Sequence, residues 1–249
     1  MPYEVLATSR TPAVIVYILD VSASMSQPLG NRRRIDVVTD ALQAALQVMV
    51  FRSTKGSLLA PRYRIAMLAY SDHVYDLLDG FKTVDHVARL GAPELSPMRT
   101  TDTARAFEQA EKLLRAELAS MRACPAPLVC HMTDGEYTGA DPEPVASRIM
   151  QMSVPDGNVL VENIFISDRI LTQPVTDPTQ WPGVLPDTKL QSDYARKLRA
   201  MSSPLPESYR VMMLEHNYHL AQGARMLLPG TSPELVSMGF QMSAATPVR

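Results

Sequence analysis

The first polar residues after a long apolar run could bind a metal cation. The run from Ala13 to Leu19 is bulky and mostly β-branched, which predicts a buried β-strand. Asp20, Ser22 and Ser24 follow it at alternating positions and place one carboxylate and two hydroxyls in one loop. Hard divalent cations prefer oxygen ligands of this kind. The simpler interpretation is a turn in which the same side chains satisfy nearby backbone groups.

Two later stretches carry similar side chains. Thr101 lies in the run 99–103 before a helical pattern, and Asp134 closely follows the apolar run 127–132. Ligands of open α/β sheets bind beyond the carboxyl ends of the strands. The three loops would therefore supply two carboxylates and three hydroxyls to one cation. Because hydroxyls are neutral, such a cation would stay electrophilic and could take a carboxylate from another molecule.

The three motifs, in this order, resemble the metal-ion-dependent adhesion site of von Willebrand factor A (vWA) domains. The family has D-x-S-x-S in the first loop, a Thr in the second and an Asp in the third. The resemblance implies that Ser22 and Ser24 bind the metal directly. Asp20 and Asp134 would bind directly or through water, and Thr101 would bind when the site is occupied. The implied metal is Mg²⁺, with Mn²⁺ or Ca²⁺ as alternatives, and a protein partner would complete the shell with an Asp or Glu carboxylate.

The second loop leaves the identity of its ligand open. The family pattern is usually Thr-x-Thr, and Thr101 and Thr103 fit it with Thr101 as the ligand. Thr100 and Thr103 remain alternatives. Ala23 stands where the family often has Gly, a small change that should not disturb the two hydroxyls. Asp102 either tunes the metal or is a solvated acid at a helix N-terminus.

Other residues near these loops have two interpretations each. Arg32, Arg33 and Arg34 either steer acidic partners towards the metal loop or form a solvated run. We interpret His131, in a predicted central strand, as a hydrogen-bonded core residue and not as a ligand. Cys130 lies in the same strand and is expected to be a small core residue, not a reactive thiol.

The composition excludes several classes of protein. Of the 249 residues, 46% are hydrophobic and 20% charged, as in a soluble globular chain. A net charge of −2 gives no electrostatic footprint for nucleic acid. Residues 1–11 lack a secretory signal, and no apolar run is long enough to span a bilayer. We therefore expect a cytoplasmic protein that does not bind membranes, and the two cysteines fit a reducing compartment.

Strands and helices alternate along the sequence, which predicts an α/β fold. A short connection after the second strand requires an antiparallel neighbour at 74–78. The expected architecture is a doubly wound, mostly parallel, Rossmann-like sheet with one antiparallel edge strand and helices on both faces. The predicted strands are 13–19, 62–70, 74–78, 127–132, 159–166 and 223–230. The predicted helices are 35–52, 83–90, 106–121, 141–152, 190–201, one within 206–223, and 232–242.

We expect one domain over residues 1–249, with a core from about 13 to 242. Prolines recur every four residues from Pro174 to Pro186 and make 168–188 an irregular excursion, which we take as an insertion. Its Trp181 is either a plug over the core or a contact anchor, and the plug is the favoured interpretation.

The sequence lacks the motifs of several enzyme classes. Haloacid-dehalogenase-type phosphatases place a second Asp two residues after the first, where this chain has Ser22. It has no G-x-S-x-G nucleophile elbow and no phosphate-binding glycine loop. We therefore expect a binding module and no enzymatic activity. The alternatives are a regulatory subunit of an ATPase or kinase/phosphatase system, as in cytoplasmic bacterial vWA proteins resembling the tellurium-resistance group, and a metal-dependent hydrolase.

Overall fold

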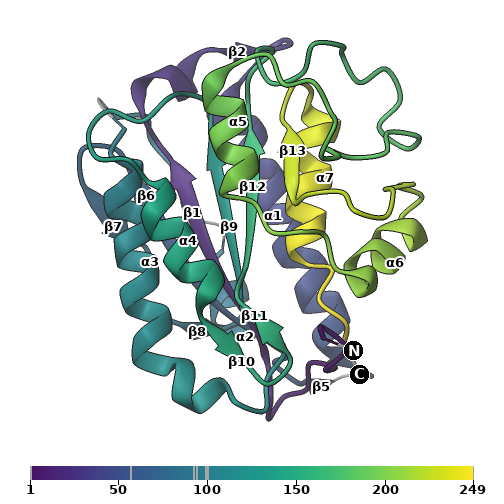
Figure 1. Cartoon of the computed structure of the whole chain (residues 1–249). Helices are drawn as coiled ribbons and strands as arrows, with labels where there is room; N and C mark the ends of the chain where they lie inside the picture. The colour runs from purple at the N-terminus through teal and green to yellow at the C-terminus, as the bar shows by residue number, and fades with distance from the viewer. Residues whose placement is uncertain (1, 57, 92, 94, 99–100, 249) are drawn as a thin grey trace.

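A central β-sheet organises the chain (Figure 1). The computed structural model describes residues 2–56, 58–91, 93, 95–98 and 101–248. Its sheet has the strand order β13-β12-β9-β1-β6-β7, and β8 also pairs with β6. The strands are β1 (Ala13–Asp20), β6 (Tyr63–Tyr70), β7 (Val74–Asp76), β8 (Lys82–Thr83), β9 (Leu128–Thr133), β12 (Leu160–Phe165) and β13 (Leu227–Pro229).

Most of this sheet is parallel. The strands β13, β12, β9, β1 and β6 run in one direction, and β7 pairs antiparallel with β6. The antiparallel edge predicted from the short connection is therefore confirmed. The short strand β8 is a second antiparallel neighbour of β6, and two residues are too few to show a periodic pattern in the sequence.

Helices cover both faces of the sheet (Figure 1), which confirms the doubly wound architecture. One face packs against α1 (Arg34–Ser53), α2 (Val84–Leu90) and α7 (Pro233–Ser243). The other face packs against α3 (Thr103–Glu117), α4 (Glu143–Gln151) and α5 (Asp193–Ala200). Beyond β13, α6 (Glu207–Glu215) contributes to a third apolar cluster. Short 3₁₀ helices are η1 (Ala23–Ser26) and η2 (Leu118–Met121).

The strand β1 lies in the middle of this arrangement and is buried along its whole length. Ile15, Tyr17 and Leu19 face the α1 side, whereas Val16 and Ile18 face the α3 side. Side chains alternate between the two faces of a strand, so a strand with helices on both sides must be apolar at every position. This is why the sequence shows a continuous apolar run there.

Three small hairpins were not predicted from the sequence. They are β2 (Pro28–Leu29) with β3 (Arg32–Arg33), β4 (Thr54–Lys55) with β5 (Leu58–Leu59), and β10 (Ser153–Val154) with β11 (Gly157–Asn158). Each pairs strands of two residues, which local turn geometry can stabilise without any apolar periodicity. The first of them leads the chain from the loop 21–27 into α1.

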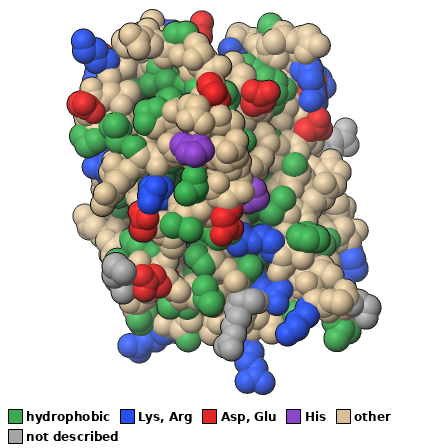
Figure 2. All heavy atoms as spheres, turned by 90° about the vertical axis from the view of Figure 1, so that its right-hand side faces the viewer, with side chains coloured by type: hydrophobic (Ala, Val, Ile, Leu, Met, Phe, Trp, Pro, Cys, Tyr) green, Lys and Arg blue, Asp and Glu red, His purple; other side chains and the backbone are tan. Residues whose placement is uncertain are grey.

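The proline-rich excursion 168–188 contains no helix, as the prolines predicted. Its Trp181 is partly buried and packs against the core clusters beside α5 and α6. This placement favours the plug over the contact anchor. Figure 2 shows the face of the molecule that carries this region, where acidic, basic and hydrophobic side chains are interspersed and basic side chains gather only towards the lower end.

The last helix begins as its sequence predicted. Ser232 is the N-cap of α7, and its hydroxyl accepts a hydrogen bond from Leu235 N at 3.3 Å. The two ends of the chain then meet, because Ala7 N donates to Pro247 O at 2.8 Å. They lie at the opposite end of the sheet from the hairpin of β2 and β3 (Figure 1). No helix among the described residues is long and apolar enough to cross a membrane.

Candidate functional site

The first loop of the candidate site is held by a buried aspartate. Asp20 is the last residue of β1, so the strand ends one position later than the sequence predicted, and the residue is fully buried. Its Oδ1 accepts a hydrogen bond from Ser22 N at 2.8 Å. Such a bond between an Asp side chain and the backbone two residues on turns the chain sharply. The turn aims the next residues at the carboxyl edge of the sheet.

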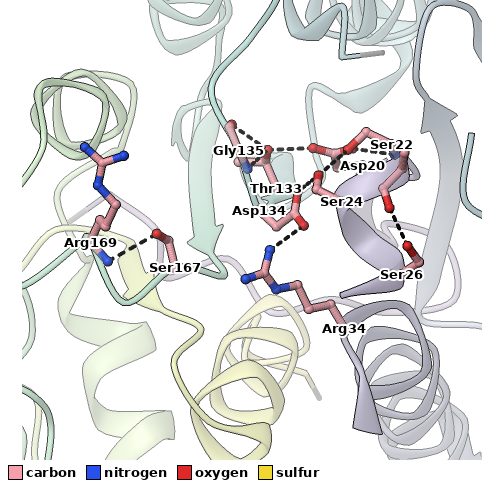
Figure 3. Close-up of polar contacts among 11 residues, drawn as sticks. Asp20, Ser22, Ser24, Ser26, Arg34, Thr133, Asp134, Gly135, Ser167 and Arg169 are labelled. Atoms are coloured by element: carbon pink, nitrogen blue, oxygen red, sulfur yellow. Dashed lines mark hydrogen bonds and ion pairs between the residues drawn. The ribbon is translucent and has the colours of Figure 1, made fainter. Parts of the chain in front are cut away.

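Side chains of the first and third loops converge there (Figure 3). The hydroxyl of Ser24 donates to Asp134 Oδ1 at 2.7 Å, and the hydroxyls of Ser22 and Ser24 lie 3.1 Å apart. Thr133 donates to Asp20 Oδ2 at 2.7 Å, a role that the sequence analysis did not assign. Because β9 is the parallel neighbour of β1, their two ends deliver these groups to one place. Four of the five expected ligands are thus brought together.

Thr101, the fifth expected ligand, belongs to the loop that precedes α3. It is nearly buried, and its backbone oxygen accepts hydrogen bonds from Thr138 N at 2.7 Å and Thr138 Oγ1 at 3.1 Å. Thr138 lies in the loop that follows Asp134. Among the described residues, hydrogen bonds therefore tie Thr101 to the third loop and not directly to the two serines.

The alternatives to Thr101 have different positions. The hydroxyl of Thr103 is buried and lies 3.4 Å from Tyr70 Oη, below the loop surface. Thr100 lies outside the described residues. Asp102 is the N-cap of α3, and its Oδ1 accepts from Arg105 N at 3.2 Å. Asp102 therefore has the helix-terminal role that the sequence analysis weighed against tuning of the metal.

The two carboxylates of the site have different surroundings. Burial raises the pKa of Asp20 to about 6, partly offset by its hydrogen bonds with Ser22 and Thr133. Asp134 adds to the increase through charge repulsion. The side chain of Asp134 is itself fully buried and is paired with Arg34, whose Nη1 lies 2.8 Å from Asp134 Oδ2. Arg34 is thus the cationic partner of Asp134, whereas Asp20 is held by hydrogen bonds from Ser22 and Thr133.

The arginine run after the first loop divides into two groups. Arg32 pairs with Asp40 and Arg33 with Asp36, and these pairs are exposed, as in a solvated surface run. Arg34 instead turns inward and reaches Asp134 across 100 residues of sequence. It is the first residue of α1, whereas Arg32 and Arg33 belong to a hairpin strand. The sequence analysis did not separate the three arginines.

The core beneath the site contains a buried hydrogen-bond network. His131 Nε2 lies 2.8 Å from Tyr70 Oη, and its Nδ1 lies 2.7 Å from Asn163 Oδ1. Burial lowers the pKa of His131 to about 4, so the imidazole is neutral at pH 7. His131 is therefore a hydrogen-bonded core residue, as predicted. Cys130 is also fully buried, and burial raises the pKa of its thiol well above the ordinary value.

The chemistry of the donor set fits a hard divalent cation. Asp20, Ser22, Ser24 and Asp134 offer only oxygen atoms, and each carboxylate oxygen that accepts one hydrogen bond keeps a second lone pair. A bound cation would also compensate the buried negative charge. Among the described residues, no three His, Cys, Asp or Glu side chains form a group that could hold a metal. Binding at this edge would therefore depend on the hydroxyls.

Residues 15–136 match the family model of the von Willebrand factor type A domain. The matched segment begins in β1, ends just after β9, and contains all five expected ligands. No curated protein matches the sequence. The family match and the fold together support a vWA domain protein.

Solved structures show the same fold at low sequence identity. The SpRpn10 VWA domain is 12% identical with a TM-score of 0.53, and the alignment covers 91% of this chain and 92% of that one. Proximal thread matrix protein 1 of the mussel byssus is 15% identical with a TM-score of 0.55, covering 94% of this chain and 47% of that one. The pilus adhesin SpaC of Lactobacillus rhamnosus GG is 10% identical with a TM-score of 0.59, and the alignment covers 94% of this chain and 30% of that one.

These similarities concern the fold alone. This chain spans less than half of the mussel protein and less than one third of SpaC. Another structure of the mussel protein has a zinc-occupied MIDAS motif.

Proposed function

We propose that this chain is a metal-dependent protein-binding module and not an enzyme. Asp20, Ser22, Ser24 and Asp134 would hold one Mg²⁺, and Thr101 would join them when a partner is bound. The observation that carries this proposal is the 2.7 Å hydrogen bond between Ser24 Oγ and Asp134 Oδ1, which joins two loops 110 residues apart at the carboxyl edge of the sheet. The apolar core lies below this edge and does not require these oxygen ligands to converge.

The bound cation would supply a Lewis-acidic position for an Asp or Glu carboxylate of a partner protein. Ser22 and Ser24 contribute no charge, so they leave the site electrophilic. Asp20 fixes the loop through Ser22 N and is itself fixed by Thr133. vWA domains commonly mediate protein–protein interactions, and the proposed role agrees with that.

The site offers little for turning over a substrate. Asp20 has both oxygens engaged by Ser22 and Thr133, and the position two residues after it is a serine. His131 cannot act as a general base at the surface, because it is fully buried with both ring nitrogens hydrogen-bonded. The proposed activity is therefore binding. By analogy with cytoplasmic bacterial vWA proteins, including those resembling the tellurium-resistance group, we propose the same setting for this chain.

Capture of partners from a native extract tests this function. The immobilised chain should retain a partner with Mg²⁺ and release it with a chelator. Thr101→Ala should weaken retention with little effect on thermal unfolding, because Thr101 is held mainly through its backbone. Thr54→Ala is the matched control, since Thr54 is exposed in β4 at the far end of α1. Equal retention with Mg²⁺, with chelator and by Thr101→Ala would contradict the proposal.

A further inference from the structure

The inward arginine of the site has a geometry that a purely structural ion pair does not need. Arg34 Nη1 donates to Asp134 Oδ2, while Asp134 Oδ1 accepts from Ser24. The carboxylate thus bridges the cationic side chain and a proposed metal ligand. Figure 3 shows the guanidinium of Arg34 reaching towards Asp134 from below the two serines. Arg34 therefore lies beside the position that a cation would occupy.

The guanidinium is not fully used by the protein. Its side chain is 20% exposed, and its Nε is buried without a hydrogen-bond partner among the described residues. A guanidinium has five N–H donors, and a buried donor without a partner is costly. Because Nε is buried, an incoming anion would meet Arg34 at the part of its side chain that stays exposed, next to Asp134.

The positive charge of Arg34 changes the net charge of the site. When ionised, Asp20 and Asp134 contribute two negative charges, and Arg34 contributes one positive charge. A divalent cation without Arg34 would only neutralise the two carboxylates. With Arg34 present, the loaded site carries one net positive charge, and a carboxylate from a partner brings it to neutrality. Burying an uncompensated charge is expensive, so this balance favours binding of a single anion.

We propose that Arg34 is the residue that makes the loaded site selective for an anion: it weakens cation binding in the free protein and strengthens carboxylate binding once the cation is present. This inference rests on the proposed metal site and adds a role for a side chain outside the ligand set. Arg34 opposes the incoming cation by charge repulsion and by holding Asp134 Oδ2. It then attracts the carboxylate through the same charge and its remaining N–H donors.

The test uses Mn²⁺ titrations followed by calorimetry, in chloride and in acetate at equal ionic strength. Acetate serves as the carboxylate probe. Arg34→Gln should tighten Mn²⁺ binding in chloride by about tenfold, because it removes a positive charge within a few ångströms of the cation. In the wild-type protein, acetate should tighten Mn²⁺ binding by about threefold, since the two ligands favour each other reciprocally. In Arg34→Gln this effect of acetate should be clearly smaller than in the wild-type protein.

Two further variants separate charge from folding. Arg33→Gln removes the same charge from the neighbouring position, where the side chain pairs with Asp36 at the surface, and should resemble the wild-type protein in both titrations. Arg34→Lys keeps the charge and should retain the effect of acetate. Thermal unfolding of each variant shows that it is folded at the temperature of the titration.

The possible results distinguish this inference from the proposed function. If Arg34→Gln bound Mn²⁺ as Arg33→Gln does, or kept the full effect of acetate, the inference about Arg34 would be wrong, whereas the proposed metal site would still be supported. If the wild-type protein bound no Mn²⁺, the proposed function would fail and the role of Arg34 would fail with it.

Discussion

Glu162 should make the stability of the protein fall as pH rises, and Glu162→Gln should remove that dependence. Glu162 lies on β12 opposite Cys130 of β9 and is completely buried. Neither of its carboxyl oxygens has a hydrogen-bond partner among the described residues. Burial raises its pKa well above the ordinary value. The native protein therefore holds this carboxyl protonated under conditions in which the unfolded chain ionises it.

The sign and size of the effect follow from proton linkage. A group whose pKa is raised on folding contributes its full stability below the unfolded pKa and loses it as pH rises towards the folded pKa. For each pH unit in which native Glu162 stays protonated and the unfolded group is ionised, the free energy of unfolding falls by about 1.4 kcal/mol. Between pH 5 and 7, the free energy of unfolding of Glu162→Gln should therefore rise relative to that of the wild-type protein by as much as about 3 kcal/mol.

Urea unfolding at pH 5, 6 and 7 measures this difference. Asp20 also titrates in this window, with a pKa of about 6, but it does so in both proteins and cancels in the comparison. Tyr17, Tyr209 and Cys130 are the titratable neighbours of Glu162, and burial raises the pKa of each, so they stay neutral.

Glu111→Gln is the control for Glu162→Gln. Ion pairs with Arg148 and Arg115 lower the pKa of Glu111, so its contribution is lost only as pH falls through that lowered pKa. The cost of Glu111→Gln should be constant between pH 5 and 7. If Glu162→Gln also differed from the wild-type protein by a constant amount over this range, native Glu162 would be ionised and the reasoning from burial would be refuted.

Two further predictions concern the metal and the core beneath it. Removal of divalent cations with a chelator should leave a cooperatively folded protein by circular dichroism, because the apolar clusters contain none of the proposed ligands. Metal at a hundred times its Kd would add about 2.7 kcal/mol to the free energy of unfolding. Unfolding by chelator at room temperature would contradict the account. His131→Leu should lower the free energy of unfolding in urea by about 2–5 kcal/mol, because it leaves buried polar groups of Tyr70 and Asn163 without their partner. A decrease below about 1 kcal/mol would mean that the network contributes little.

The main elements of the fold could be predicted from the sequence because their signals are strong. The apolar run from Ala13 must be buried on both sides, and the helix after it repeats apolar residues at helical spacing. The polar residues at the strand ends then meet because parallel neighbours end at one edge. The assignment of one domain over residues 1–249 stays a prediction.

Other features depend on contacts that a sequence pattern does not contain. Three consecutive arginines look alike, and only the start of α1 at Arg34 turns that side chain towards Asp134. Glu162 interrupts an apolar run, and the pattern gave no sign that its carboxyl would be buried without a partner. The hydroxyl of Thr133 acts on Asp20 through a strand pairing that joins residues 113 apart.

The metal ligation itself is tested most directly by calorimetric titration of three proteins with Mn²⁺. The wild-type protein should bind one ion, and Ser24→Ala should bind it at least about tenfold more weakly, because it loses a ligand that also orients Asp134. Ser26→Ala is the matched control from the same loop, since its exposed hydroxyl donates only to Ala23 O at 2.6 Å. It should bind as the wild-type protein does. Absence of binding at millimolar Mn²⁺, or equal binding by Ser24→Ala and the wild-type protein, would contradict the account.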